Sequence, residues 1–301
     1  MKRISTLLVT VCLVGLAAPT AAALNVFTCQ SEWASLVREI AGDKAAVSSA
    51  TTAAQDSHRV EARPSLIARM RSADLVVCTG SDLEIGWLPV LLSQAGNARV
   101  QPGNPGYLEA SQYVARIEIP ATIDRSHGDI HPGGNPHIHT DPRNIAKVAE
   151  ALIERLTQLD AANAPTYRSR GKSFLARWRS AIQRWEQQAA PLRGVPIVVY
   201  HKDWSYFIKW LGLREVGSLE PKPGIPPTSA YLAELVGRMQ REPAKIIIYA
   251  AYNSPKPAQF LAERTRIPEV MLPFTVGGSE AAKDLFGLFD DTMARLLAVV
   301  K

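Results

Sequence analysis

The chain has 301 residues, a formal net charge of +6 and only three cysteines. Its basic residues are scattered and form no dense run, which argues against a nucleic-acid-binding protein. Its length suits one large domain or two medium ones.

The first part of the chain has the pattern of a cleaved export signal. Residues 1–23 begin with two basic residues, continue with an apolar run over 4–16 and end in three alanines. The run is too short to span a bilayer, and the bulky residue before Cys12 makes a poor lipid-attachment site. We therefore expect a soluble, monomeric periplasmic protein whose signal peptide is removed.

Strand and helix patterns alternate through the first half of the mature chain. Strand-like runs lie at 25–29, 45–50, 74–78 and 114–119, and helical spacing lies between them at 33–42, 64–70 and 83–92. This alternation predicts a parallel sheet with helices on both faces.

Two long helices are expected in the middle of the chain. Asp141 caps the first, which has one apolar face. The second covers 164–188, where a narrow apolar stripe containing Trp178 and Trp185 lies among many polar residues. A narrow stripe suits a helix that spans two lobes, each covering part of it.

The second half repeats the α/β alternation. Asp203 is expected to cap a helix that Gly212 ends, and Ser279 to cap the closing helix. Expected strands lie at 196–200, 216–219, 245–249 and 268–272, with helices at 229–240 and 255–265. We predict an N-terminal lobe over 24–163, a linking helix over 164–190 and a C-terminal lobe over 191–301.

Two cysteines, Cys29 and Cys78, remain after signal cleavage, and each ends a strand-like run. The oxidising compartment favours a disulfide if those strands are neighbours. The alternative is two buried thiols that pack as small apolar side chains.

Four of the six histidines fall within thirteen residues, and the other two, His58 and His201, stand far away. The clustered four are His127, His131, His137 and His139. Imidazole is the commonest zinc ligand, so this distribution indicates a metal-binding protein. His201 directly follows a strand, and ligands of open α/β sheets gather at the carboxyl ends of strands.

The string His137-x-His139-x-Asp141 also matches the start of the HxHxD motif of metallo-β-lactamase-type hydrolases. Pro142 stands where that motif has a further histidine, and a proline in the first turn makes Asp141 a helix cap. A zinc-dependent hydrolase is therefore kept only as an alternative.

Several motifs resemble the periplasmic zinc- and manganese-binding proteins of metal ABC transporters, the cluster A-I solute-binding proteins. They are Asp56-Ser-His58 with Arg63-Pro64-Ser65, Ala73–Gly80 with Leu83-Glu84, Asn135-Pro136-His137 with Asp141-Pro142, Tyr200-His201 with Trp204 and Tyr206-Phe207, and Ser254–Pro257. The resemblance covers nearly the whole mature chain. It implies two α/β lobes joined by a rigid helix, with the metal bound in the interlobe cleft by His58, His137 and His201.

The family's fourth ligand, usually an acidic residue in the last lobe, has no clear match here. Glu280 is the nearest candidate, Asp284 the next, and a water molecule is the alternative. His139 stands where relatives usually carry an aromatic or apolar residue, so it is expected to support the ligands rather than bind the metal. The resemblance also makes the strands that end in Cys29 and Cys78 neighbours, which favours their disulfide.

Zinc-specific members of the family often carry a longer histidine-rich loop just before the position that corresponds to His137. We expect His127, Asp129 and His131 to form an auxiliary site that captures metal weakly.

Three imidazoles favour zinc as the cargo over manganese. The predicted function is a periplasmic zinc receptor, not an enzyme, that serves an inner-membrane ABC permease and a possible periplasmic metal chaperone. A manganese or iron receptor of the same fold would carry a second carboxylate ligand, and an adhesin would need a surface anchor.

Overall fold

The computed structural model describes residues 23–122, 124 and 128–300, so the predicted signal peptide lies outside the described residues apart from Ala23. Two four-stranded parallel sheets organise the chain. The N-terminal sheet has the order β2 (Ala45–Ser49), β1 (Leu24–Thr28), β3 (Leu75–Cys78), β4 (Tyr107–Glu109). The C-terminal sheet has the order β6 (Arg214–Ser218), β5 (Pro196–Val199), β7 (Ile246–Ala250), β8 (Glu269–Leu272). The predicted class, two parallel α/β lobes, is confirmed.

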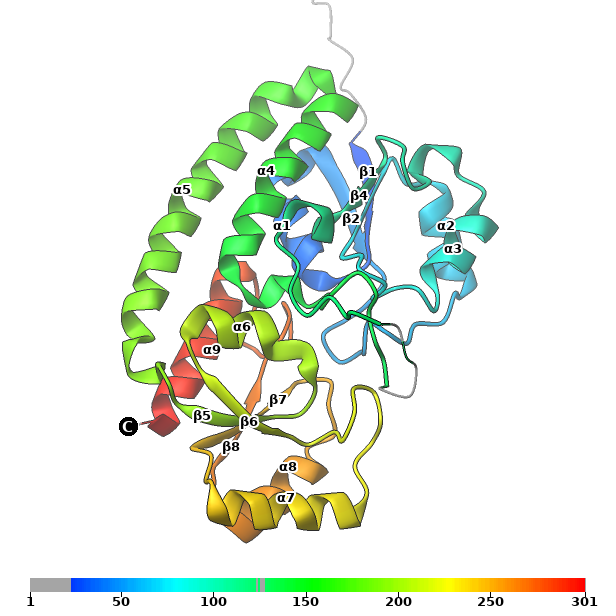
Figure 1. The fold of residues 1–301 in the computed structure, drawn as a ribbon. Helices are drawn as coiled ribbons and strands as arrows, with labels where there is room; N and C mark the ends of the chain where they lie inside the picture. The colour runs from blue at the N-terminus through cyan, green and yellow to red at the C-terminus, as the bar shows by residue number, and fades with distance from the viewer. Residues whose placement is uncertain (1–22, 123, 125–127, 301) are drawn as a thin grey trace, which may run out of the picture.

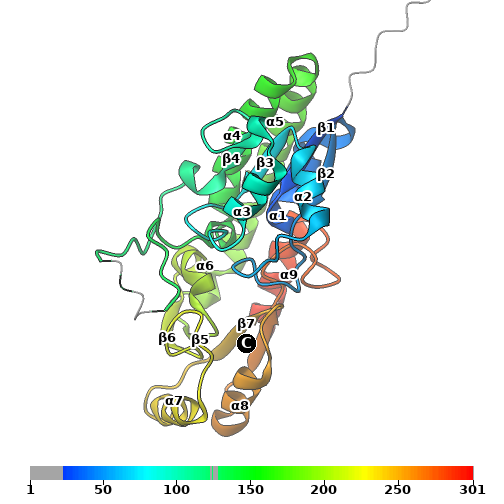
Figure 2. The same cartoon turned by 90° about the vertical axis from the view of Figure 1, so that its right-hand side faces the viewer.

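Helices flank both sheets, and one long helix runs beside both lobes (Figure 1). In the first lobe they are α1 (Ser31–Ala41), α2 (Pro64–Arg71), α3 (Leu88–Ala95) and α4 (Pro142–Leu159). The long helix is α5 (Ala164–Gln188). They continue with α6 (Ser205–Leu211), α7 (Ser229–Arg241), α8 (Lys256–Thr265) and α9 (Leu285–Val300). In Figure 2, α7 and α8 lie side by side at the far end of the second lobe.

One apolar core is continuous between the lobes. It joins Val26 of β1 and Ile197 of β5 through buried aromatic side chains of α5 and α9. Trp178 stacks on Phe174 at 5.3 Å between ring centroids, and Trp185 lies 5.0 Å from Phe289 of α9. Separate, smaller cores fill the outer layers of each lobe, under α2 and α3 and under α7 and α8.

The parallel register of β1 and β3 brings the two cysteines together. Val26 pairs with Leu75 and Thr28 with Val77, so Cys29 and Cys78 leave neighbouring strands at the same edge. Their Cα atoms are 4.8 Å apart and the two sulfurs form a disulfide. The predicted pairing is confirmed.

Four local expectations are wrong. Residues 114–119 form no strand, and the fourth strand is β4, just before them. The Ile117 N–H donates to the Tyr206 hydroxyl of the other lobe instead of to a sheet neighbour. A three-residue strand is too short to show a periodic pattern, which explains why the sequence does not reveal β4. The helix expected over 83–92 begins only at Leu88, after a run of turns.

The other two errors concern helix caps. Asp203 does not cap α6, because it is buried and its Oδ2 accepts a hydrogen bond from the Tyr252 hydroxyl. Ser279 accepts from the Ala282 N–H in a turn before α9, and Asp284 Oδ1 accepts from the Gly287 N–H at the start of that helix. The cap at Asp141 and the helix end at Gly212 are confirmed. No helix in the described part of the chain combines the length and apolar character needed to cross a bilayer.

Candidate metal site

His58 lies in the loop between β2 and α2, and a carboxylate holds its ring. Asp56 Oδ1 lies 2.7 Å from His58 Nδ1 and also accepts the His58 backbone N–H at 2.9 Å. Burial raises the pKa of Asp56, but the hydrogen bonds and charge of His58 outweigh it and the net pKa is lowered. An ionised Asp56 accepts the Nδ1 proton, so Nε2 of His58 presents its lone pair outward.

His201 lies two residues after the end of β5, at the carboxyl end of the C-terminal sheet. Glu220 Oε2 lies 2.7 Å from His201 Nδ1 and plays the role that Asp56 plays for His58. Both side chains are largely buried, with 8% and 12% of their surface exposed. The arrangement again leaves Nε2 free for a ligand.

His137 stands just before α4, in the segment between β4 and α4 that contacts the other lobe. Its backbone N–H donates to Asn135 Oδ1, and Asn135 Nδ2 donates to the Lys202 carbonyl of the other lobe at 2.7 Å. The ring is 3% exposed, and its Nε2 is buried without a hydrogen-bond partner. A buried nitrogen without a partner is costly, so this atom is suited to bind a metal ion.

The three rings converge on one point between the lobes. Their centroids form a nearly equilateral triangle, with sides of 5.3 Å for His58–His137, 5.6 Å for His58–His201 and 5.7 Å for His137–His201. Nitrogen atoms of all three lie within 4.8 Å of one another. The ring planes are inclined by 64–82° to each other, as in ligands that approach one ion from different directions.

His131 contacts one member of this group, His58, whereas no contact with the group is seen for the predicted fourth ligand. His131 Nε2 lies 3.3 Å from His58 Nε2. Glu280 and Asp284 are exposed in the segment before α9, and neither belongs to the cluster of ligand atoms around the three histidines. Asp129 is exposed, and its backbone N–H donates to the Pro223 carbonyl of the C-terminal lobe. His127 lies outside the described residues.

His139 points away from the three rings. Its Nε2 lies 3.1 Å from the Phe274 carbonyl, and its Nδ1 lies 3.5 Å from Glu32 Oε1. The Phe274 ring packs against both His139 and His137, at 4.7 and 5.7 Å between centroids. The next member of the HxHxD string, Asp141, caps α4 and pairs with Arg143. The string therefore does not assemble one site, which removes the basis for a hydrolase.

Burial sets the charge state of the site. Burial, reinforced by the charges of the neighbouring histidines, lowers the pKa of His137 well below its usual range. Burial also lowers the pKa of His131 to about 4. At His201 burial acts in the same direction, but the Glu220 hydrogen bond and nearby carboxylates outweigh it and raise the pKa. Neutral imidazoles at His131 and His137 are in the form that binds metal ions.

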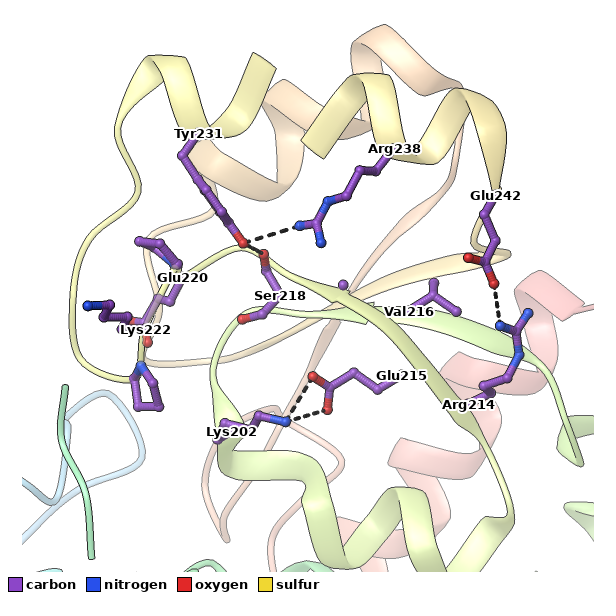
Figure 3. A pocket seen from close by; sticks show the side chains of 13 residues that line it. Lys202, Arg214, Glu215, Val216, Ser218, Glu220, Lys222, Tyr231, Arg238 and Glu242 are labelled. Atoms are coloured by element: carbon purple, nitrogen blue, oxygen red, sulfur yellow. Dashed lines mark hydrogen bonds and ion pairs between the residues drawn. The ribbon is translucent and has the colours of Figure 1, made fainter. Parts of the chain in front are cut away.

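A cavity of about 210 Å³ lies beside the site, lined by His131, His137 and His201 among others. A separate cavity of about 500 Å³ lies against the edge strand β6 (Figure 3). There Lys202 pairs with Glu215 and Arg214 with Glu242, so these charges neutralise one another. Of these two cavities, the one beside the histidines is lined by His137, whose buried Nε2 has no hydrogen-bond partner.

The supporting carboxylates were not predicted from the sequence. Asp56 stands two residues before His58, and that spacing could have been interpreted as a turn in which the Asp side chain accepts from the His backbone. Glu220 lies nineteen residues after His201 and leaves no comparable signal, because only the parallel pairing of β5 with β6 brings it there.

Two α/β lobes with a histidine cluster between them are typical of a class of binding proteins. Comparison with known protein families identifies the family within this class. The family described as ZnuA, zinc-uptake complex component A periplasmic, matches residues 26–299. The chain belongs to this family.

Among curated relatives, the metal ABC transporter substrate-binding lipoprotein ScbA of Streptococcus cristatus is 23% identical over 87% of this chain and 83% of its own length. The zinc-binding lipoprotein AdcA of Streptococcus pneumoniae is 22% identical over 89% of this chain but only 54% of its own length. The manganese ABC transporter substrate-binding lipoprotein PsaA of Streptococcus pneumoniae is 23% identical, over 84% and 80%.

Solved structures share the fold. A crystal structure of ZnuA superimposes with a TM-score of 0.77 at 20% identity, covering 93% of this chain and all of that one. The Cd-bound periplasmic metal-binding protein of Candidatus Liberibacter asiaticus has a TM-score of 0.74 at 18% identity, covering 92% and 99%. The relatives named for zinc and for manganese match to similar extents, so likeness alone does not choose the metal.

Proposed function

We propose that this protein is a periplasmic receptor that captures Zn²⁺ and delivers it to an inner-membrane ABC permease. The observation that supports the proposal is the convergence of His58, His137 and His201, two of them backed by carboxylates. The export pattern over residues 1–23 supplies the route to the periplasm.

Zinc fits the donor set better than manganese does. Among the described residues, the ligand atoms that cluster here are imidazole nitrogens of the three histidines. The nearby carboxylates bind Nδ1 of two of these histidines. Zinc accepts nitrogen ligands in tetrahedral sites, whereas manganese prefers oxygen. A manganese receptor would place a carboxylate oxygen among the ligand atoms. We propose that the bound ion is cargo and that the protein catalyses no reaction.

The test is to purify the exported protein, measure its metal content, and titrate the metal-free form separately with Zn²⁺ and Mn²⁺. We expect one zinc ion per chain and a zinc affinity that exceeds the manganese affinity by orders of magnitude. Protein that arrives with manganese, or binds it more tightly than zinc, would contradict the zinc assignment.

Variants at two nearby histidines locate the site. His137→Ala should abolish tight zinc binding because it removes a ligand. His139→Ala should weaken binding by no more than about 10- to 100-fold, the usual effect of a residue that supports a ligand. Equal losses in both variants would show that the ligand assignment is wrong.

A further inference from the structure

The separation of two ring nitrogens singles out His131. His131 Nε2 lies 3.3 Å from His58 Nε2. Zinc–nitrogen bonds of about 2.0–2.1 Å in a tetrahedral site place any two ligand nitrogens about 3.3–3.4 Å apart. The observed distance has that value, and it is longer than most N–H hydrogen bonds.

The loop that carries His131 is attached to the C-terminal lobe. The Asp129 N–H donates to the Pro223 carbonyl at 2.8 Å. Two glycines permit this close approach. A Cβ atom at Gly128 would lie 2.3 Å from the Pro223 oxygen, and one at Gly224 would lie 1.9 Å from Asp129 Oδ2. The loop and the turn at residues 220–225 therefore meet without room for side chains at these positions.

The same turn also supports the other ligands. Glu220 Oε2, which holds His201, accepts the Gly224 N–H at 2.8 Å. Arg59, next to His58, donates to the Gly224 carbonyl at 3.4 Å. The turn therefore contacts the loop of His131, supplies the carboxylate that holds His201, and contacts Arg59 next to His58.

The ring of His131 lies in a suitable position for a ligand. It packs beside the rings of His58 and His137, with ring centroids 5.3 and 6.5 Å away. Its Nδ1 is buried and has no hydrogen-bond partner. A loop that only connected two elements would gain nothing by placing this partly buried ring against two other imidazoles.

We propose that His131 is the fourth ligand of the bound metal and completes a tetrahedral site of four imidazoles. This inference rests on the proposed function and specifies its site. The contact between the loop and the turn at 220–225 then holds His131 at the metal, and coordination by His131 in turn stabilises that contact. Four nitrogen ligands also explain how a site without a carboxylate ligand selects zinc over manganese.

The test compares His131→Ala with Pro132→Ala, an exposed neighbour in the same loop that offers no ligand atom. Competition titrations should show that His131→Ala lowers zinc affinity by more than about 100-fold, beyond the usual effect of a supporting residue. Pro132→Ala should match the wild type. Long-range ¹H–¹⁵N spectra of the zinc-loaded protein should show four imidazoles with a metal-shifted nitrogen in the wild type and three in His131→Ala.

Gly128→Ala provides an independent variant that keeps every imidazole but obstructs loop docking. It should lower zinc affinity, in the same direction as His131→Ala and to a smaller extent. Circular dichroism and the melting temperature of each metal-free variant check that it folds.

Two results would overturn the inference while leaving the proposed function intact. One is tight zinc binding by His131→Ala, within about tenfold of the wild type, which would make His131 a hydrogen-bond partner of His58. The other is a wild-type spectrum with only three shifted imidazoles. Failure of the wild type to bind zinc would instead refute the proposed function.

Discussion

At the scale of single residues, the site is built from pairs in which a carboxylate orients an imidazole. Asp56 holds His58 and Glu220 holds His201, each through Nδ1 at 2.7 Å. Such partners select the tautomer with a free Nε2 and restrict ring rotation, so less entropy is lost when the metal binds. The orientation of these two imidazoles therefore depends on the carboxylates that bind them.

This dependence can be tested at Glu220. Glu220→Gln keeps the side-chain length but removes the charge that stabilises His201 Nδ1–H, so we expect zinc affinity to fall by about 10- to 100-fold. Glu215→Gln is the matched control, because Glu215 of β6 pairs with Lys202 (Figure 3). Equal affinities of the two variants in calorimetric titration would contradict the supporting role of Glu220.

At the scale of elements, the turn between α4 and α5 is held by one carboxylate. Asp160 Oδ2 accepts from the Tyr167 hydroxyl at 2.6 Å and from Asn163 Nδ2 at 2.7 Å. Burial opposes ionisation of Asp160, but these hydrogen bonds prevail and lower its pKa. The turn fixes the direction in which the long helix leaves α4.

The lowered pKa predicts how stability changes with pH. Because the folded state favours the ionised form, this contribution is fully present above the unfolded pKa of Asp160, near 3.8, and is lost as the pH falls through the lower folded pKa. Asp160→Asn should reduce the free energy of unfolding at pH 7 by about 1 kcal/mol, the difference between a charged and a neutral hydrogen bond. Urea denaturation at pH 7 and pH 3 checks this, and a difference that stays constant between the two would refute it.

The disulfide belongs to the same scale, because it ties two adjacent strands. Cys29 and Cys78 enclose a segment with a sequence separation of 49, so the bond restricts the unfolded chain strongly. Replacing both by serine should lower the free energy of unfolding by about 2–4 kcal/mol. Thiol titration of the denatured, unreduced exported protein should find no free sulfhydryl, and two free thiols would contradict the pairing.

At the scale of the whole molecule, the continuous core limits how the lobes can move. Buried aromatic residues of α5 and α9 connect the two sheets, and Trp185 Nε1 donates to Asp290 of α9 at 2.6 Å. Also, α9 contacts α1 of the first lobe, although its sequence follows the second. A hinge motion would have to break this packing, whereas loops at the site can move without doing so.

We therefore expect metal loading to leave the overall shape unchanged and to order the loops around the site. Small-angle scattering should give the same radius of gyration with and without zinc. Hydrogen exchange should slow mainly in residues 128–134 and 220–225. A marked compaction on zinc binding would show that the lobes close as rigid bodies.

Much of this architecture is readable from local patterns. The alternation of strands and helices predicts parallel sheets, and the stripe with Trp178 and Trp185 predicts a helix shared by two lobes, because periodicity reports which face is buried. The short motifs around His58, His137 and His201 resemble those of the metal-binding family, and this resemblance implies a common site. These features depend on residues close in sequence, so a single chain shows them.

Other features were decided only by tertiary structure. Three such features arise where segments far apart in sequence meet. They are the support of His201 by Glu220, the contact of His131 with His58 and the position of Glu280 outside the histidine cluster. The family resemblance indicated a weak capture loop around His131, but the loop contacts the C-terminal lobe through Asp129 and its histidine ring lies beside His58. Local propensity does not contain such contacts, since they depend on the packing of two lobes against each other.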